Sequence, residues 1–211
     1  MPTQGEKNYD WLKLARRLQS IAQAGLTFTE GPYDKERYRE LMEISATLVT
    51  EFTGKTFETV HDLFSFETGY LTPKVDVRGV VFDANKILLV KETADNRWAL
   101  PGGWADVDLS PKENAVKEIE EESGLKTEPI RLLAIMDKKF HQHPPDIYHC
   151  YKLFILCKKI GGSLKGSIET SEVGFFELQQ LPELSHERNT EAQIKLMFDY
   201  LQNPEKDVWV D

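Results

Sequence analysis

Three glutamates stand close together in one short segment of the chain, at Glu118, Glu121 and Glu122. At this spacing their side chains would share one face of an α-helix. Like charges three and four residues apart destabilise an isolated helix, so helix stability gives no reason for the arrangement. Carboxylate oxygens are ligands that Mg²⁺ and Mn²⁺ prefer, and these ions also bind phosphates. Taken alone, such a run is more often a solvated acidic helix face, but the helix-capping signals and the glycines on both sides favour a divalent-metal site acting on a phosphate.

The sequence around these glutamates specifies both ends of the helix that must hold them. The tetrapeptide Ser110–Glu113 matches a capping box, with proline at the first helical position. Gly124 can take the left-handed conformation that ends a helix. We therefore expect a helix over Pro111–Ser123.

The segment Gly102–Leu125 resembles the Nudix box, the signature motif of the Nudix hydrolases. The positions that match the motif are Gly103, Glu118, Ile119, Glu121, Glu122, Gly124 and Leu125. The resemblance implies that the three glutamates carry the catalysis. It also implies that they bind Mg²⁺ or Mn²⁺ together with Gly102.

Two positions depart from the motif, because Leu109 and Lys117 stand where the family has glutamate and arginine. In the family the arginine generally steadies the carboxylate cluster, and lysine offers only a point charge in place of a fork. We interpret the two departures as linked, since losing the early glutamate removes one acceptor for that fork. The neighbouring Asp108 is a candidate replacement. The metal-binding glutamates are intact, so we still expect an active site.

The implied reaction is hydrolysis of the pyrophosphate bond of a nucleoside diphosphate linked to a further moiety. We predict that Arg78 clamps the pyrophosphate, because a guanidinium binds phosphate oxygens in pairs; the alternative is a surface arginine on a strand. Gly102 and Gly103 lack side chains and let the backbone approach the substrate closely. The residues eligible as the base that takes the proton of water are Glu118, Glu169 and Glu172.

A loop over Lys138–His149 concentrates cationic and aromatic residues around two consecutive prolines. Loops on a rigid scaffold commonly select the substrate, so we predict substrate contacts from Lys138 and His149. Trp104 is a further candidate, because its ring can stack on a base or face a quaternary ammonium. The alternative for any one of these aromatic rings is packing in the core.

The N-terminal part of the chain has helical periodicity. Apolar residues recur at helical spacing over Tyr9–Ala24, and Gly25 is expected to end that helix. A second helix is expected after Pro32 and a short one around Thr56–Phe64. Such helices cannot bury their apolar faces alone, so residues 1–66 are expected to form a helical domain that is either a packing appendage or the contact of a homodimer.

From Lys74 onward the pattern changes to strands, closed by a helix at Thr190–Gln202. The expected strands are Val75–Phe82, Ile87–Val90, Ile130–Asp137, Tyr148–Lys158 and Glu172–Glu177. A mixed sheet covered by one helix on each face is an α/β/α sandwich. This layering is similar to the Nudix fold, so residues 67–211 are expected to form a Nudix hydrolase domain. The helices and the following Gly69–Gly79 also resemble a Nudix subgroup that includes CDP-choline and ADP-ribose pyrophosphatases.

Composition limits the partners. The net charge of −9 over 211 residues disfavours tight binding to duplex nucleic acid. No apolar run is long enough to cross a bilayer, and Met1–Gly5 has no signal-peptide character. Cys150 and Cys157 lie seven residues apart in one expected strand, where they would point to opposite faces and stay reduced. We therefore expect a cytoplasmic protein with a small-molecule nucleotide substrate.

Three functions remain open from the sequence. The first is a metal-dependent pyrophosphatase for a conjugate such as CDP-choline or ADP-ribose. The second is an RNA-acting Nudix hydrolase, which the acidic balance disfavours. The third is a non-catalytic Nudix-like module that binds a nucleotide, which the intact glutamates disfavour.

Overall fold

The chain divides into two compact units in the computed structural model, which describes residues 4–211 apart from the side chains of residues 4–10 and 66. The first unit comprises the chain up to Pro73 together with residues 145–149, and the second comprises residues 74–144 and 150–211. Part of the expected signal-free stretch Met1–Gly5 lies outside the described residues. The boundary expected after residue 66 stays a prediction. The loop Lys138–His149 is divided between the two units.

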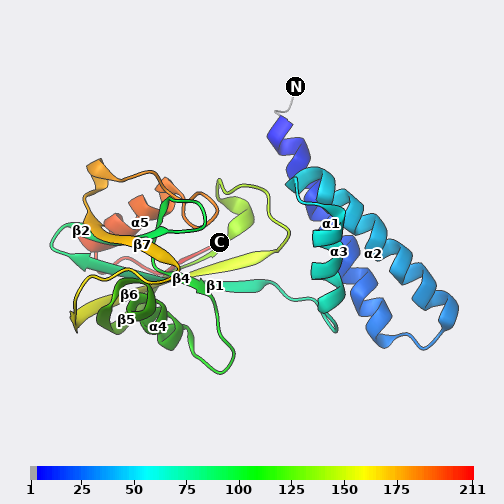
Figure 1. The fold of residues 1–211 in the computed structure, drawn as a ribbon, viewed down its shortest axis with the longest axis horizontal. Coiled ribbons are helices and arrows are strands. Elements are labelled where there is room, and N and C mark those ends of the chain that lie inside the picture. The colour runs from blue at the N-terminus through cyan, green and yellow to red at the C-terminus, as the bar shows by residue number, and fades with distance from the viewer. Residues whose placement is uncertain (1–3) are drawn as a thin grey trace. The chain divides into compact units, whose positions relative to one another are not determined.

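Three helices make up most of the first unit: α1 (Gln4–Phe28), α2 (Pro32–Thr53) and α3 (Phe57–Phe66) (Figure 1). The Ser45 hydroxyl of α2 donates a hydrogen bond to the Ala15 carbonyl of α1 at 2.7 Å, deep between the two helices. The buried residues of the apolar core cluster of this unit are Leu12, Ala15, Ala46, Val49, Val60, Phe64 and Ile147.

The predicted end of the first helix at Gly25 is wrong, because α1 continues to Phe28. Gly25 instead faces the Tyr38 ring of α2, where an added Cβ would lie 2.3 Å from the ring Cζ atom. The missing side chain therefore lets the two helices approach each other. It does not end the helix.

The apolar residues that recur along α1 are only partly buried. Leu12, Ala15 and Ala22 are buried, whereas Trp11, Leu14 and Ile21 are 52%, 53% and 45% exposed. The exposed three recur at helical spacing, so they form an apolar stripe along one side of α1. The described residues of the first unit leave this stripe about half exposed.

The second unit is built on one mixed sheet (Figure 1). Its strands are β1 (Lys74–Asp83), β2 (Lys86–Glu92), β3 (Trp98–Ala99), β4 (Gly102–Trp104), β5 (Leu125–Asp137), β6 (Cys150–Gly162), β7 (Thr170–Phe176) and β8 (Trp209–Val210). The order is β3-β2-β1-β6-β5-β8, with β4 paired to β1 and β7 to β2. The β1–β6 and β5–β8 pairs are parallel and the others antiparallel.

Two helices, α4 (Pro111–Ser123) and α5 (Glu191–Gln202), cover opposite faces of the sheet (Figure 1). Alternating strand residues sort between the two faces. On one face, Val80, Leu89 and Phe154 of the strands cluster with Ile194 and Met197 of α5. On the other face, Val77, Leu88 and Ile155 of the strands cluster with Ala115 and Ile119 of α4. The expected α/β/α sandwich with an N-terminal helical region is confirmed.

The predicted bounds of the carboxylate helix are confirmed, because α4 runs from Pro111 to Ser123. Both hydrogen bonds of the capping box form, and Gly124 ends the helix with φ 72°. The helix also lies close to β1, since a Cβ on Gly79 would be 2.5 Å from the Cδ1 atom of Ile119. Local capping and close packing together fix the position of the glutamates on the sheet.

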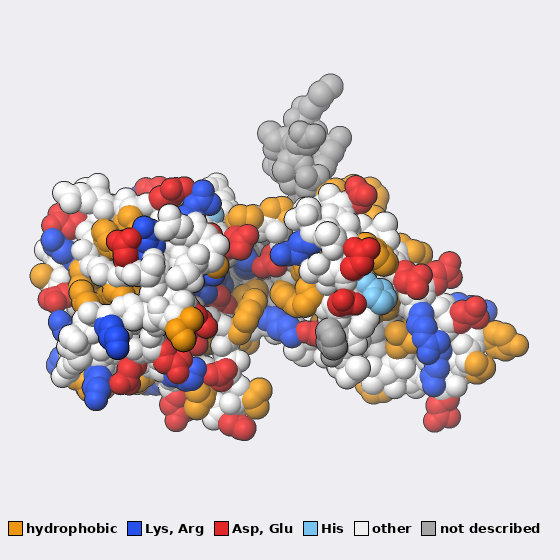
Figure 2. All heavy atoms as spheres, in the orientation of Figure 1, with side chains coloured by type: hydrophobic (Ala, Val, Ile, Leu, Met, Phe, Trp, Pro, Cys, Tyr) orange, Lys and Arg blue, Asp and Glu red, His pale blue; other side chains and the backbone are white. Residues whose placement is uncertain are grey.

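Cys150 and Cys157 are both buried and unbridged. Within residues 4–211, no helix is at once long enough and apolar enough to pass through a membrane. On the face drawn in Figure 2, acidic and basic side chains are interspersed over both units.

Candidate active site

Glu122 is the most deeply placed of the three glutamates. Its side chain is 5% exposed, and its Oε2 atom accepts a hydrogen bond from the backbone N–H of Gly102 at 3.0 Å. Burial raises the pKa of this carboxyl to about 8, although the positive charge of Arg78 acts in the opposite direction. Glu122 therefore joins the helix to the turn formed by Gly102 and Gly103 (the glycine turn). Its burial disfavours the charged form of its carboxyl.

Glu118 lies one turn earlier on α4 and is half-buried. Burial raises its pKa; the negative charge of Glu121 acts in the same direction, and Lys117 opposes it. A Cβ on Gly103 would sit 3.6 Å from the Oε1 atom of this carboxylate. The glycine therefore leaves open the space directly beside Glu118.

Glu121 is exposed and lies in an ion pair. Its Oε2 atom is 2.8 Å from Nζ of Lys117, and the same ammonium is 3.1 Å from Oδ2 of Asp106. Hydrogen bonds to these two carboxylates raise the pKa of Lys117. In the loop before the helix the lysine thus pairs with Asp106, whereas the candidate Asp108 has a left-handed backbone with φ 67°. Lys117 ties the loop that precedes the helix to the third turn of the helix.

Arg78 is buried beneath the site, with 3% of its surface exposed. Its Nε and Nη2 atoms donate to the two carboxylate oxygens of Asp76 at 2.7 and 2.8 Å, and Nη1 donates to the Leu100 carbonyl at 3.0 Å. Nζ of Lys152 lies 3.0 Å from Asp76 Oδ2. The alternative of a surface arginine is therefore wrong. The fork predicted to clamp pyrophosphate is already occupied by a carboxylate.

The charges and the burial of the triad Asp76, Arg78 and Lys152 shift the pKa values of these residues and of neighbouring carboxyls. The two cations hold the pKa of Asp76 well below its usual range despite its burial. Burial lowers the pKa of Lys152 to about 8. The positive charge of Arg78 also partly opposes the rise that burial causes in the pKa of Glu122, and it does the same for Glu92.

Glu92, at the end of β2, is a site residue that sequence reasoning missed. It is 5% exposed, its pKa is raised by burial, and its Oε1 atom lies 2.9 Å from Nε of Arg188. Its negative charge also raises the pKa of Glu122. The signal available in the sequence was a carboxylate placed two residues after the apolar run Ile87–Val90.

The glycine turn is fixed from both sides. The Leu100 N–H donates to Oδ1 of the buried Asn189 at 2.8 Å. Gly102 has φ 141°, and a Cβ there would lie 2.0 Å from the Val77 carbonyl oxygen. Only glycine fits this position.

The other predicted residues lie in several places. Trp104 is half-exposed on β4 and pairs with Asp76 of β1. Lys138 begins a short 3₁₀ helix, η1 (Lys138–Phe140). His149 lies in the segment that belongs to the first unit. The structure brings together Gly102, Gly103, Arg78 and the glutamates.

The two candidate bases on the later loop differ in their surroundings. Glu172 is held on the sheet by Lys91, whose Nζ atom lies 2.7 Å from its Oε1. Glu169 is exposed, and its charge raises the pKa of Glu92. Glu169 is therefore the one that lies toward the carboxylate cluster.

The histidines of the predicted loop are engaged within the protein. Nε2 of His141 lies 2.9 Å from Oδ2 of Asp211. Nδ1 of His143 donates to the His186 carbonyl at 2.7 Å, and burial lowers the pKa of His143 to about 3.

The donor set suits a hard divalent cation. Glu118 and Glu122 both offer carboxylate oxygens. The negative charge of Glu118 raises the pKa of Glu122, and a bound cation would stabilise both carboxylates in their charged form. Within residues 4–211, no group of three or more His, Cys, Asp or Glu side chains stands ready to hold a metal ion. Glu121 would join Glu118 and Glu122 only by leaving Lys117.

The sandwich and the glutamate helix facing a glycine turn are those of a Nudix-type hydrolase. Residues 72–199 match the family description "NUDIX domain", and residues 9–64 match "UDP-X-like, N-terminal oligomerisation domain". The chain belongs to the Nudix hydrolases, an enzyme family with pyrophosphatase members that generally use a divalent metal.

Several relatives are similar over most of the chain. The putative ADP-ribose pyrophosphatase YjhB of Bacillus subtilis is 51% identical over 196 residues, covering 93% of this chain and 94% of the relative. A crystal structure of a UDP-X diphosphatase is 34% identical with a TM-score of 0.63, covering 97% and 99%. That of an ADP-ribose pyrophosphatase from Streptococcus suis is 44% identical with a TM-score of 0.61, covering 66% and 100%.

Proposed function

We propose that this enzyme hydrolyses the pyrophosphate bond of a nucleoside diphosphate linked to a sugar, with ADP-ribose as the favoured substrate. The observation that carries the proposal is the pair Glu118 and Glu122, half-buried and buried, facing a glycine turn above the guanidinium of Arg78. ADP-ribose is favoured over CDP-choline because the relative that is 51% identical along the chain bears the former name.

Each residue has a part in this proposal. Glu118 and Glu122 would hold Mg²⁺ or Mn²⁺ with Gly102, and Glu121 would join them after leaving Lys117. When bound, the metal would polarise the phosphate oxygens. Arg78 positions Glu122 electrostatically from below. Substrate contacts from Gly103, Trp104, Lys138 and His149 remain part of the proposal.

The half-buried Glu118 and the exposed Glu169 are the candidates to take the proton of the attacking water. Glu172 is the weaker candidate, because its carboxylate is already paired with Lys91. The reduced cysteines support a cytoplasmic location, where such thiols persist.

A hydrolysis panel tests this function. ADP-ribose, a UDP-sugar, CDP-choline and a 5′-triphosphorylated RNA would each be offered with Mg²⁺ or Mn²⁺. We expect ADP-ribose to give the highest kcat/KM, and Glu118→Gln to lower it by roughly 10²-fold or more. The matched control is Glu120→Gln, a substitution of the exposed glutamate on the same helix, which should stay within about twofold. Failure of every substrate, or equal activity of the two variants, would overturn the proposal.

We also propose that the enzyme is a homodimer formed through α1. The exposed stripe of Trp11, Leu14 and Ile21 lies in the region that matches an oligomerisation domain. Apolar stripes of this kind are commonly buried against a partner.

Sedimentation of wild-type protein and of Leu14→Glu at micromolar concentration tests the dimer. The wild type should sediment as a dimer, and the variant as a monomer, because a charge would have to be buried in the interface. Lys13→Glu, a substitution at a neighbouring exposed position outside the stripe, should remain dimeric. A monomeric wild type would reject the proposal.

A further inference from the structure

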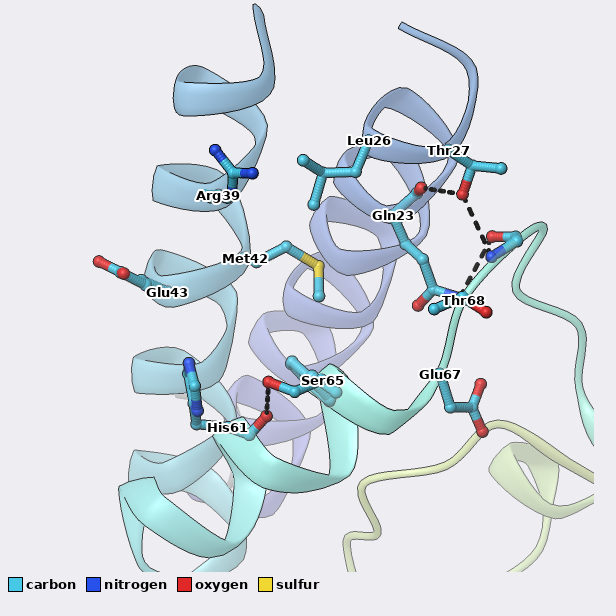
Figure 3. Close-up of a pocket in the computed structure, with 12 residues that line it drawn as sticks. Gln23, Leu26, Thr27, Arg39, Met42, Glu43, His61, Ser65, Glu67 and Thr68 are labelled. Carbon is cyan, nitrogen blue, oxygen red and sulfur yellow. Dashed lines mark hydrogen bonds between the residues drawn. The ribbon is translucent and has the colours of Figure 1, made fainter. Parts of the chain in front are cut away.

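The first unit contains a cavity of about 640 Å³ between its helices and the segment that follows α3. Figure 3 shows residues of α1, α2 and α3 around the same space. This volume is within the range of small-molecule sites. All of its lining residues, from Gln23 to Gly69, belong to the first unit, so the cavity is distinct from the carboxylate cluster.

Gln23 gives this cavity an unused hydrogen-bond acceptor. Its side chain is 3% exposed, and its Nε2 atom donates to the Gly69 carbonyl at 3.2 Å. That bond fixes the amide orientation, since the flipped amide would bring two oxygens together. Within the described residues, Oε1 of Gln23 then has no hydrogen-bond partner. A buried acceptor left this way is costly, so a donor that reached it would bind favourably.

The hydroxyls of Thr27 and Ser65 do not supply that donor. The Thr27 hydroxyl donates to the Gln23 carbonyl at 2.9 Å, and the Ser65 hydroxyl donates to the His61 carbonyl at 2.8 Å (Figure 3). Both hydroxyl protons are thus used within the helices. A ligand in the cavity can therefore supply the missing donor.

The walls and the rim define the rest of that ligand. Leu26, Met42 and Phe64 present apolar surface. The charged residues of the lining are of both signs, with Arg39 opposed by carboxylates such as Glu43. An apolar body therefore suits the walls, and the rim gives no preference for a net charge.

We propose that this cavity binds a neutral small molecule with an apolar ring system and one N–H or O–H donor, which Oε1 of Gln23 accepts. Because Oε1 is buried, binding requires the amide to turn toward the cavity while Nε2 stays near Gly69. The site gives the helical unit a binding function besides assembly.

Indole and indene form a matched pair of probes, because they share size and shape and only indole has an N–H. Methyl-¹³C-methionine NMR reports on binding, since Met42 lines the cavity and Met136 and Met197 lie in the core of the second unit. We expect indole to shift the Met42 signal in a saturable manner, with an affinity about tenfold above that of indene. The Met136 and Met197 signals should not move.

Two variants test the hydrogen-bond acceptor and the cavity volume separately. Gln23→Leu, which removes the acceptor, should remove the difference in affinity between indole and indene. Leu26→Trp, which fills the cavity and keeps the amide, should abolish binding of both probes. Unchanged Met136 and Met197 signals verify the fold of the second unit in each variant, and an intact Met42 signal verifies the first.

Three results would overturn the proposal. The first is a Met42 signal that does not respond to millimolar indole. The second is equal binding of the two probes by the wild type, which would mean an apolar hole without a used acceptor. The third is a Met42 signal that shifts with protein concentration alone and no longer responds to indole, which would mean that a second copy of the chain covers the cavity.

Discussion

Glu122→Gln should abolish most of the activity and leave the protein at least as stable as the wild type. Glutamine can still accept the hydrogen bond from the Gly102 N–H, so the glycine turn keeps its anchor. It cannot supply the negative charge that binds a cation or takes part in proton transfer. We expect kcat to fall by roughly 10²–10⁴-fold.

The stability of this variant should depend on pH in a defined direction. The folded protein raises the pKa of Glu122 from 4.5 to about 8, so between these values the folded state binds more protons than the unfolded state. Wild-type stability is therefore lost as the pH rises through this window. Glutamine does not titrate. Near pH 8 the free energy of unfolding of the variant should therefore exceed that of the wild type by an amount of the order of a few kcal/mol.

Urea unfolding of both proteins at pH 5 and pH 8, with chelator present, measures this difference. Glu120→Gln is again the matched control, because it removes a carboxylate from the same helix at an exposed position. A Glu122→Gln protein that keeps full activity would reject the role of this residue. A protein that loses stability at pH 8 would show that the buried charge is compensated better than the geometry indicates.

Asp76→Asn should be the most destabilising conservative substitution in the second unit. It removes the one carboxylate that accepts from Arg78 and Lys152, both of which are almost fully buried. Lys152 would then lose its ion-pair partner, and Arg78 would keep only its weaker charge interactions with Glu122 and Glu92. Breaking a buried ion pair from one side costs about 3–5 kcal/mol.

Chemical denaturation at pH 7 measures this loss. The control is Glu183→Gln, which breaks the exposed pair with Arg97 and should change stability by no more than about 0.5 kcal/mol. Because the pKa of Asp76 is held well below 3.8, its contribution is present above that pH and is lost only at lower pH. The difference between variant and wild type should therefore persist down to pH 4. A difference as small as that of the control would contradict the argument.

The parts of the fold that local chemistry determines were predictable from the sequence. The bounds of α4 follow from a capping box and a terminal glycine, which act within a few residues. The layers of the sandwich follow from the alternation of apolar and polar residues in the strands and from the helical periodicity of apolar residues in the helices. Gly25 shows the limit of such reasoning, because its effect depends on the Tyr38 ring of another helix.

The buried electrostatics of the site could not be predicted in the same way. Asp76 and Lys152 meet because β1 and β6 pair in parallel in a particular register, and no short-range pattern specifies that register. Arg78 reads from the sequence as a strand residue available to a phosphate, but its fork is occupied by a neighbour two positions away. The partnership of Lys117 with Asp106 depends likewise on the path of a loop.

The return of residues 145–149 to the first unit has a consequence for synthesis of the chain on the ribosome. Ile147 is part of the apolar core of that unit, and its carbonyl accepts from Nε of Arg16 at 3.0 Å. The helices can associate as soon as they emerge, but their core stays incomplete until about 80 further residues have been translated. The N-terminal unit therefore cannot finish folding before most of the hydrolase unit has been made, so a nascent chain stalled before residue 145 would hold the helices in a looser, protease-sensitive state.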